Sequence, residues 1–345
     1  MSTLCVYDVS TFVYVGTNTR DIYSDKVLGF PAKGIFYMNK YMACDLGEGN
    51  DVVLCFDSKS FRKKLDKGYK SNRINNPEIW AQLDFLYDYY NRIGIVCHKV
   101  DGYEADDLIF NVVEANRAKY KEIVVYGTDY DLCHNVCYRT RFESINSITN
   151  SVDYKNFKHA VEKGVTIPFN TITAYKVFMG DKSDTIKMFK GSNCNGEMLY
   201  KLYLKAMEQA VGSDPMIIRT RKALELFLER IKDNLTEADY KQLQTRMDIF
   251  FPAVVDGEKY GVNFSEVSNR RNIDLSKLGE YFSNLGDMRS LKHMGMKNKG
   301  FIPEIRDDIR RRAKELSTGA YAVKKNISTS PCVRMNSESF FVGEF

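Results

Sequence analysis

Three short apolar runs in the first part of the chain predict buried β-strands. They are Leu4–Tyr7, Asp51–Phe56 and Glu122–Tyr126. Helical spacing of apolar residues separates them, as in the stretch from Trp80 to Tyr90. Continuous apolar strands that alternate with helices are typical of a parallel sheet covered by helices on both faces. The pattern therefore predicts an α/β fold for this part of the chain.

The second half of the chain has mainly helical periodicity. Apolar residues recur every three or four positions after Thr171, and Thr236 with Asp239 resembles a helix-capping box. A late helix is predicted from Pro303, and the final residues are rich in Ser and Asn. We expect an α/β core at 1–180, a mostly helical domain at 181–330 and a flexible C-terminal tail at 331–345.

Acidic residues follow each predicted strand. Asp8 ends the first strand, Asp57 the second, and Asp129 and Asp131 follow the third. The carboxyl ends of parallel strands share one edge of the sheet, where ligands collect. Single acids at such positions are commonly caps or turn residues, but three strands that all end this way favour a common site.

A second acidic group opens a predicted helix at 101–110. It contains Glu104, Asp106 and Asp107, and a further pair, Asp181 and Asp184, follows Met179-Gly180. Like charges that converge in a cleft need divalent cations or must remain protonated. The alternative for the 101–110 stretch alone is a solvated, acidic first helical turn.

The segment 58–79 is strongly basic and contains aromatic residues. Cations that follow a phosphate backbone, together with rings that stack on bases, are typical of a single-strand channel. A solvated basic helix is the alternative, and the position directly after Asp57 favours the channel. Its cations are Lys59, Arg62, Lys63, Lys64, Lys67, Lys70 and Arg73, with Phe61 and Tyr69 between them.

Composition adds few constraints. The 345 residues carry a net charge of +5, which permits a polyanionic partner. The eight cysteines are scattered without a Cys-x-x-Cys pair, which indicates a reducing cytoplasm. Cys133, His134 and Cys137 could be considered as zinc ligands, but a fourth ligand is not evident. We find neither a signal peptide nor an apolar run of membrane-spanning length.

Taken together, these motifs resemble the structure-specific 5′ nuclease family, in its bacteriophage and bacterial branch of flap endonucleases, 5′–3′ exonucleases and phage RNase H-type enzymes. The resemblance implies a PIN-like nuclease core with a helical arch at 58–79, and then a helical DNA-binding domain with a helix-hairpin-helix-like element. The matching segments, in family order, are Val6–Asp8, Phe56-Asp57, Tyr69–Arg73, Gly102–Asp107, Thr128–Asp131 and Met179–Asp184.

The resemblance also implies roles for individual residues. Lys70 and Arg73 would contact the scissile phosphate, Tyr69 would position a base, and Arg62, Lys63, Lys64 and Lys67 would bind substrate. Two Mg²⁺ ions, for which Mn²⁺ would substitute, would polarise the phosphodiester and activate water. Their first cluster would be Asp8, Asp57, Glu104, Asp106 and Asp107, and their second Asp129, Asp131, Asp181 and Asp184, with Asp106 serving both.

The chain departs from the family after the last acidic pair. The family usually continues Asn-Ile-Pro-Gly-Val-x-Gly-Ile-Gly, whereas this chain has Thr185–Asn193 without the proline or the last glycine. Ile186, Phe189 and Gly191 keep their places, and Asn tolerates a left-handed backbone. A bound K⁺ ion is therefore in doubt, and we expect Lys187, Lys190 and Gly191 to contact phosphate instead.

The function we expect is metal-dependent 5′ nuclease activity on 5′-flap DNA or RNA–DNA primers during replication. The alternatives are a PIN-type ribonuclease, a catalytically inactive nucleic-acid-binding replication accessory protein, and a non-catalytic acidic surface. All nine acidic positions hold Asp or Glu, which disfavours an inactive site. We expect a cytoplasmic monomer, in a bacterial host if phage-encoded. The aromatic tail would fold back or dock on a sliding clamp or single-strand-binding protein.

Overall fold

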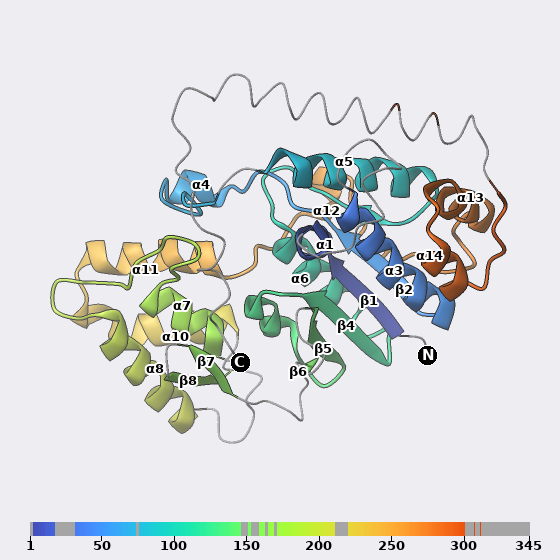
Figure 1. The fold of residues 1–345 in the computed structure, drawn as a ribbon. Coiled ribbons are helices and arrows are strands. Elements are labelled where there is room, and N and C mark those ends of the chain that lie inside the picture. Colours follow the sequence, from blue (N-terminus) through green and yellow to red (C-terminus); the bar gives the residue numbers. More distant parts are fainter. Residues whose placement is uncertain are drawn as a thin grey trace, which may run out of the picture.

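The protein is built around a six-stranded sheet (Figure 1). The structure, a computed structural model, describes residues 3–17, 32–73, 76–145, 151–152, 159–162, 165–168, 171–210 and 220–300, together with Asp307 and Arg311. The strand order is β3-β2-β1-β4-β5-β6. The strands are β1 (Thr3–Asp8), β2 (Asp51–Cys55), β3 (Cys97–His98), β4 (Glu122–Gly127), β5 (Thr140–Ser144) and β6 (Ser151–Val152).

Five of these strands run parallel, and only β6 pairs in the antiparallel sense. The central strand β1 lies between β2 and β4, with Asp8 opposite Cys55 and Tyr7 opposite Tyr126. The three strands predicted from the sequence are therefore neighbours, and the predicted parallel α/β fold is confirmed. The pattern of apolar residues did not indicate β3, which is only two residues long, or β5, which alternates polar and apolar positions.

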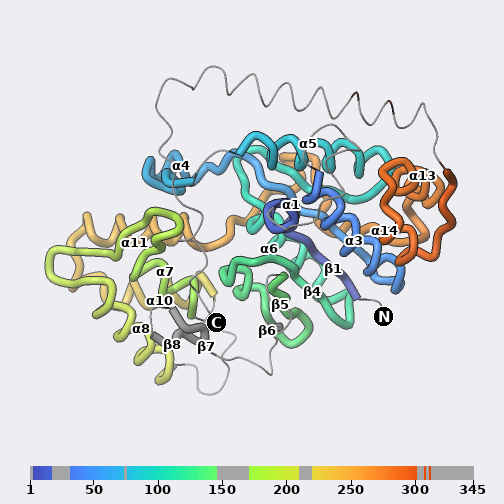
Figure 2. The backbone as a smooth tube through the Cα atoms, in the orientation of Figure 1, coloured from blue at the N-terminus to red at the C-terminus, as the bar shows by residue number. Residues whose placement is uncertain are grey.

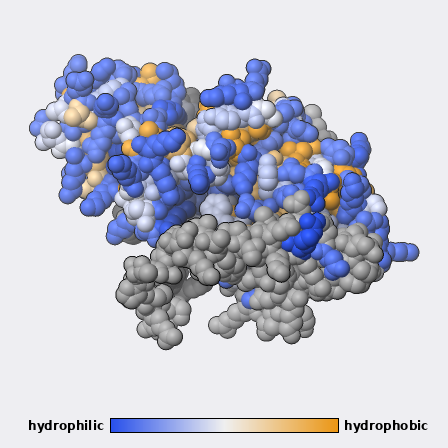
Figure 3. Space-filling view, turned by 90° about the horizontal axis from the view of Figure 1, so that it is seen from above, coloured by the Kyte–Doolittle hydropathy of each residue, from blue (hydrophilic) through white to orange (hydrophobic). Residues whose placement is uncertain are grey.

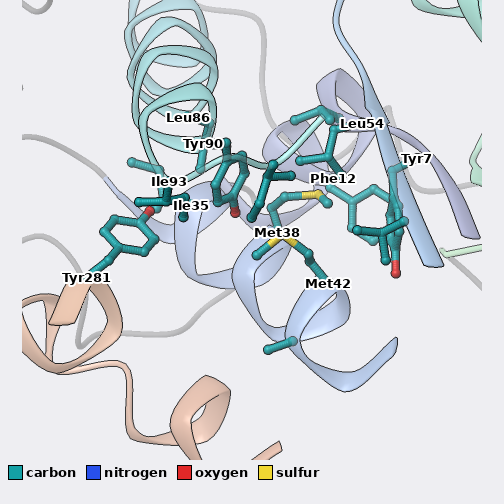
Figure 4. Packing of buried hydrophobic residues seen from close by; sticks show 14 of the residues in the cluster. Tyr7, Phe12, Ile35, Met38, Met42, Leu54, Leu86, Tyr90, Ile93 and Tyr281 are labelled. Carbon is teal, nitrogen blue, oxygen red and sulfur yellow. The ribbon is translucent and has the colours of Figure 1, made fainter. Parts of the chain in front are cut away.

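Helices cover both faces of the sheet. On one face, α1 (Val9–Thr17), α3 (Lys33–Glu48) and α5 (Pro77–Arg92) bury Tyr7, Leu54 and their neighbours (Figure 4). On the other face, α6 (Ala105–Asn116) and the 3₁₀ helix η1 (Tyr130–Asn135) pack over Val6 and Val125. Alternate residues of each strand thus enter two separate cores, as expected for a sheet buried on both sides.

The chain returns to this core near its C-terminal end. Helices α13 (Leu275–Leu285) and α14 (Met288–His293) pack against α3 and α5, with Tyr281 beside Tyr90 (Figure 4). Asn39 of α3 donates a hydrogen bond to Asp287 and accepts one from Tyr90. This placement differs from the predicted helical domain at 181–330, because these two helices belong to the core.

The remaining helices form a second lobe (Figures 1 and 2). Their side chains share a third core around Phe178, Phe189, Tyr203 and Phe227. Its first helix begins well before residue 180, so this boundary also differs from the predicted one. The lobe contains α7 (Ile172–Met179), α8 (Gly196–Ala210), α10 (Arg221–Ile231), η3 (Lys232–Asn234) and α11 (Glu237–Phe250), with the antiparallel pair β7 (His159–Glu162) and β8 (Val165–Pro168) near α7.

The segment predicted as a helical arch is anchored to both lobes. Its described residues contain one short helix, α4 (Arg62–Leu65), and a series of turns up to Arg73, and α5 begins at Pro77. The helix α12 (Gly257–Tyr260) lies in the connection that returns from α11 to the core. The helix predicted from Pro303 lies mostly outside the described residues, and the tail at 331–345 lies entirely outside them.

The coloured part of the surface in Figure 3 is largely hydrophilic, with small apolar patches between hydrophilic residues. Within the described ranges, no helix has the length and apolar character needed to cross a membrane. The seven described cysteines all carry free thiols.

Candidate active site

The topology brings the strand-end acids to one edge of the sheet. Asp8 is the last residue of β1, Asp57 follows β2, and Asp129 follows β4. Because β2, β1 and β4 are adjacent and parallel, these carboxylates lie at neighbouring strand ends. The N-terminus of α6 meets the same edge, where Asp57 accepts a hydrogen bond of 2.8 Å from the backbone N–H of Ala105.

We call Asp8, Asp57, Glu104 and Asp106 the first set. Burial and the nearby carboxylates of Asp57 and Asp129 raise the pKa of Asp8 to about 7, although hydrogen bonds from Thr11 oppose the shift. Burial, with Asp8 and Asp129, likewise raises the pKa of Asp106 well above its ordinary value. Burial is the largest cause of both shifts, and neighbouring carboxylates add to it because they disfavour a further negative charge.

Glu104 differs from the rest of the first set because three donors surround it. Lys70 Nζ lies 2.6 Å from Glu104 Oε1, while the Tyr69 hydroxyl and Arg62 approach Oε2 at 2.8 and 3.2 Å. Burial alone would raise the pKa of Glu104, but Lys70 and Arg62 lower it. Glu104 therefore holds Lys70 beside the first set.

We call Asp129, Asp131, Asp181 and Asp184 the second set. Asp129 caps η1 by accepting a hydrogen bond from the backbone N–H of Asp131. Asp181 and Asp184 lie in the loop after α7, and Arg73 forms an ion pair of 2.9 Å with Asp184. Asp181 and Asp184 also lie close enough to interact electrostatically. The sequence-predicted residues Lys70 and Arg73 thus lie over the first and second sets respectively.

The sequence analysis missed Lys176. This residue of α7 is buried, and its Nζ lies 2.7 Å from Asp131 Oδ2, 2.6 Å from Asp181 Oδ2 and 3.7 Å from Asp129 Oδ1. Burial would raise the pKa of Asp181, but Lys176 holds it at about 2. A single lysine inside the otherwise apolar run Ile172–Met179, five positions before an acid, is the signal that could have identified it.

Asp107 is held by Arg62, which also contacts Glu104. Its side chain is fully buried and forms a bidentate ion pair with Arg62 at 2.7 and 2.8 Å. The backbone N–H groups of Glu104 and Ala253 donate two further hydrogen bonds to it. The oxygens of Asp107 thus have protein donors in this structure, and its role as a metal ligand stays a prediction.

Arg62 and Tyr69, which were predicted to bind substrate, make structural contacts, and their substrate roles stay predictions. Arg62 is buried and also donates to the carbonyl oxygens of Ile249 and Phe251. Tyr69 is buried in the core of the helical lobe. Both residues anchor the 58–73 segment, which places Lys70.

The other predicted substrate-binding residues lie on the surface or in a tight loop. Lys63, Lys64 and Lys67 are exposed on and after α4, and Lys187 and Lys190 are exposed in the loop between α7 and α8. Gly191 lies in the same loop, but its N–H donates to the carbonyl oxygen of Cys194. The next N–H, of Ser192, donates to the Asp239 carboxylate at 3.0 Å. These two amides already have intramolecular acceptors.

The two sets suit hard divalent cations. All their side-chain ligands are carboxylate oxygens, which Mg²⁺ and Mn²⁺ prefer. Among the buried side-chain atoms of the described ranges, Asp131 Oδ1 has no hydrogen-bond partner. In the same ranges no three acidic, His or Cys side chains converge closely enough to enclose an ion by themselves. A cation here would keep several water ligands, as Mg²⁺ usually does.

Comparison with known proteins identifies relatives among 5′–3′ exonucleases. The profile of the 5′–3′ exonuclease N-terminal, resolvase-like domain matches residues 16–163. A 5′–3′ exonuclease of Aquifex aeolicus is 26% identical over 261 residues, which are 72% of this chain and 84% of that protein. A 5′–3′ exonuclease of Mycoplasma genitalium is 31% identical over 146 residues, or 40% of this chain and 49% of that protein.

A solved structure of a bacteriophage T5 flap endonuclease, in a complex with DNA and metal ions, has 12% identity and a TM-score of 0.45. The alignment covers 92% of this chain and 99% of that one. The matched range of the domain profile includes the acidic motifs from Asp57 to Asp131. Residues 16–163 are therefore similar to the N-terminal domain of 5′–3′ exonucleases, and the sequence matches support a relation of this chain to the structure-specific 5′ nucleases.

Proposed function

We propose that this protein is a divalent-metal-dependent 5′ nuclease that hydrolyses phosphodiester bonds in 5′-flap DNA or RNA–DNA primers during replication. One observation carries the proposal. Eight carboxylates gather where β1, β2 and β4 end, and the cations of Lys70 and Arg73 lie directly beside them. Such an arrangement suits a reaction in which anionic phosphate must approach an acidic site.

The candidate residues would have separate roles. The first and second sets would each hold one ion, Mg²⁺ or Mn²⁺. Bound ions would polarise the phosphodiester and activate a water molecule. Lys70 would leave Glu104 to contact the scissile phosphate, where its charge opposes the charge that develops in the transition state. Arg73, which is half exposed, would hold an adjacent phosphate from its position beside Asp184.

Exposed lysines on two segments would bind the DNA backbone. Lys63, Lys64 and Lys67 form one group near α4, and Lys187 and Lys190 form another in the loop before α8. Phosphate contacts of this kind contribute affinity that decreases with salt. The backbone amides of Gly191 and Ser192 already have intramolecular acceptors. In our proposal the exposed lysines therefore contact the duplex phosphates, and no K⁺ site is involved.

Two other functions were expected as alternatives, a PIN-type ribonuclease and an inactive nucleic-acid-binding accessory protein. The position of Lys70 against Glu104 favours the nuclease with an arch-derived lysine over the ribonuclease. The eight gathered carboxylates favour an active site over an inactive one. Docking of the tail on a sliding clamp or single-strand-binding protein stays a prediction, since residues 331–345 lie outside the described part of the chain. The monomeric state and the cytoplasmic location are likewise proposals.

The test is cleavage of three end-labelled substrates: 5′-flap DNA, single-stranded DNA and an RNA–DNA duplex. Each is incubated with Mg²⁺ and with EDTA, beside an Asp106→Asn variant as a control for contaminating nuclease. We expect Mg²⁺-dependent cleavage of the flap or the primer that the variant lacks. Cleavage that persists in EDTA, or no cleavage of any substrate by a folded protein, would refute the proposal.

A further inference from the structure

Lys176 distinguishes the two acidic sets. Its ammonium lies within 2.7 Å of both Asp131 and Asp181, and 3.7 Å from Asp129. In the ranges that the structure describes, the salt bridges include no comparable partner for Asp8, Asp57 or Asp106. The second set therefore contains its own cation at the centre, whereas the cations that pair with the first set, Lys70 and Arg62, both lie at its margin on Glu104.

The position of this ammonium is fixed by packing. Lys176 lies in α7, whose residues Ala174, Val177 and Phe178 are buried in the core of the helical lobe. The backbone carbonyl of Val177 accepts a hydrogen bond from Arg246 of α11, which holds the helix further. Packing thus fixes the position of the helix, and the ammonium of Lys176 can change position only through rotation of its four-carbon side chain.

One oxygen of this set is still unsatisfied. Asp131 Oδ2 contacts the ammonium, but the buried Oδ1 of the same carboxylate lacks a partner. Buried polar atoms are nearly always hydrogen-bonded or bound to an ion or water. The lysine therefore balances charge in the second set without completing its coordination, and the set keeps the capacity to bind a further ligand.

We propose that Lys176 is a built-in counter-cation that competes with a divalent ion for the second set. A first ion would bind the first set, and a second would enter only by displacing the ammonium from Asp131 and Asp181. Since the stem of Lys176 is flexible, the displaced ammonium would remain near the site, where a substrate phosphate is a suitable new partner. This inference rests on the proposed function, and it assigns Lys176 as a positioning residue that makes second-ion binding dependent on substrate.

The test measures Ca²⁺ binding by isothermal titration calorimetry and thermal stability in EDTA, neither of which depends on activity. The variant Lys176→Met keeps the stem and removes the charge, and Lys176→Arg keeps a charge. Lys201→Met, on the exposed surface of α8, is the matched control for loss of one positive charge. We expect Lys176→Met to bind the weaker of two Ca²⁺ ions about tenfold more tightly, to melt at lower temperature in EDTA, and to recover in Ca²⁺.

Removing one carboxylate charge should partly offset the loss of the Lys176 charge in the second set. In EDTA, the double variant Lys176→Met/Asp131→Asn should melt closer to wild type than Lys176→Met does, which keeps the test valid if the single variant folds poorly. Unchanged or weaker Ca²⁺ binding by Lys176→Met, with unchanged melting in EDTA, would overturn the role of Lys176. Absence of any Ca²⁺ or Mn²⁺ binding by the wild-type protein would instead refute the proposed function.

Discussion

The backbone N–H of Lys70 donates a hydrogen bond of 2.9 Å to the backbone carbonyl of Asp184. This bond ties the segment that carries the candidate catalytic lysine to the loop that carries the last acid of the second set. At the contact, Lys70 and Thr185 have φ angles of 52° and 63°, the only positive values among the non-glycine residues that the structure describes. Left-handed backbone is unfavourable for both residue types, and for a β-branched residue especially.

The strain at Thr185 gives a prediction for stability. Replacing Thr185 with Asn, which tolerates left-handed backbone and keeps a polar side chain, should raise the free energy of unfolding by about 1 kcal/mol. Urea unfolding in EDTA measures the change, and Thr245→Asn in the regular helix α11 serves as the control, with no gain expected. A loss of stability in Thr185→Asn would mean that the hydroxyl contact with the Gly68 carbonyl outweighs the strain.

Asp106 and Asp107 should respond oppositely to the same substitution. Asp107→Asn breaks a buried bidentate ion pair with Arg62 and should destabilise the protein by about 3–5 kcal/mol. Asp106→Asn removes one of several repelling carboxylates, so in EDTA it should leave stability unchanged or higher. Urea unfolding of both variants decides the matter. Equal destabilisation of the two would contradict this difference between Asp106 and Asp107.

In activity, Asp106→Asn should lower Mg²⁺-dependent cleavage by several orders of magnitude, because it removes an ionised ligand at nearly constant volume. DNA binding in Ca²⁺ should largely persist, since exposed lysines elsewhere provide the phosphate contacts. Single-turnover cleavage and a binding titration separate the two effects. Near-normal cleavage would remove Asp106 from the metal site.

Lys70 should affect turnover more than binding. In Lys70→Ala, cleavage of bound substrate should slow markedly while affinity changes little, because the charge of Lys70 acts mainly on the transition state. Lys63→Ala and Lys64→Ala, at exposed positions of α4, should weaken binding modestly and reduce its salt dependence. If all three variants lose only affinity, the segment merely attracts DNA.

Stability without metal should depend on pH. The pKa of Asp8 is raised from 3.8 to about 7 by burial and by Asp57, so the folded state binds the proton more tightly than the unfolded state. Stability in EDTA should therefore decrease as pH rises from about 4 to about 7, and remain low above that range. Mg²⁺ should raise the melting temperature more at pH 8 than at pH 5. Melting curves across this range, with and without Mg²⁺, measure both effects.

Much of this protein could be predicted from the order of its residues. The three apolar strands and the acids that follow them identify a parallel sheet with carboxylates at one edge, because strand direction alone determines which ends meet. The basic segment and the acidic pair after α7 could also be recognised from the sequence, because the residues of each are close together in the chain. These local patterns were sufficient to indicate the resemblance to the structure-specific 5′ nucleases.

Tertiary structure alone decided which charged residues share the site. Asp106 and Asp107 are adjacent in sequence, yet successive residues of a helix point in directions about 100° apart, and only packing shows that Asp107 faces Arg62. Lys176 looked like an ordinary helical residue until three acids from two other segments enclosed it. The return of α13 and α14 to the core depends on contacts such as Asn39 with Asp287, far apart along the chain. Burial and partner choice are properties of the packed chain, which no local pattern contains.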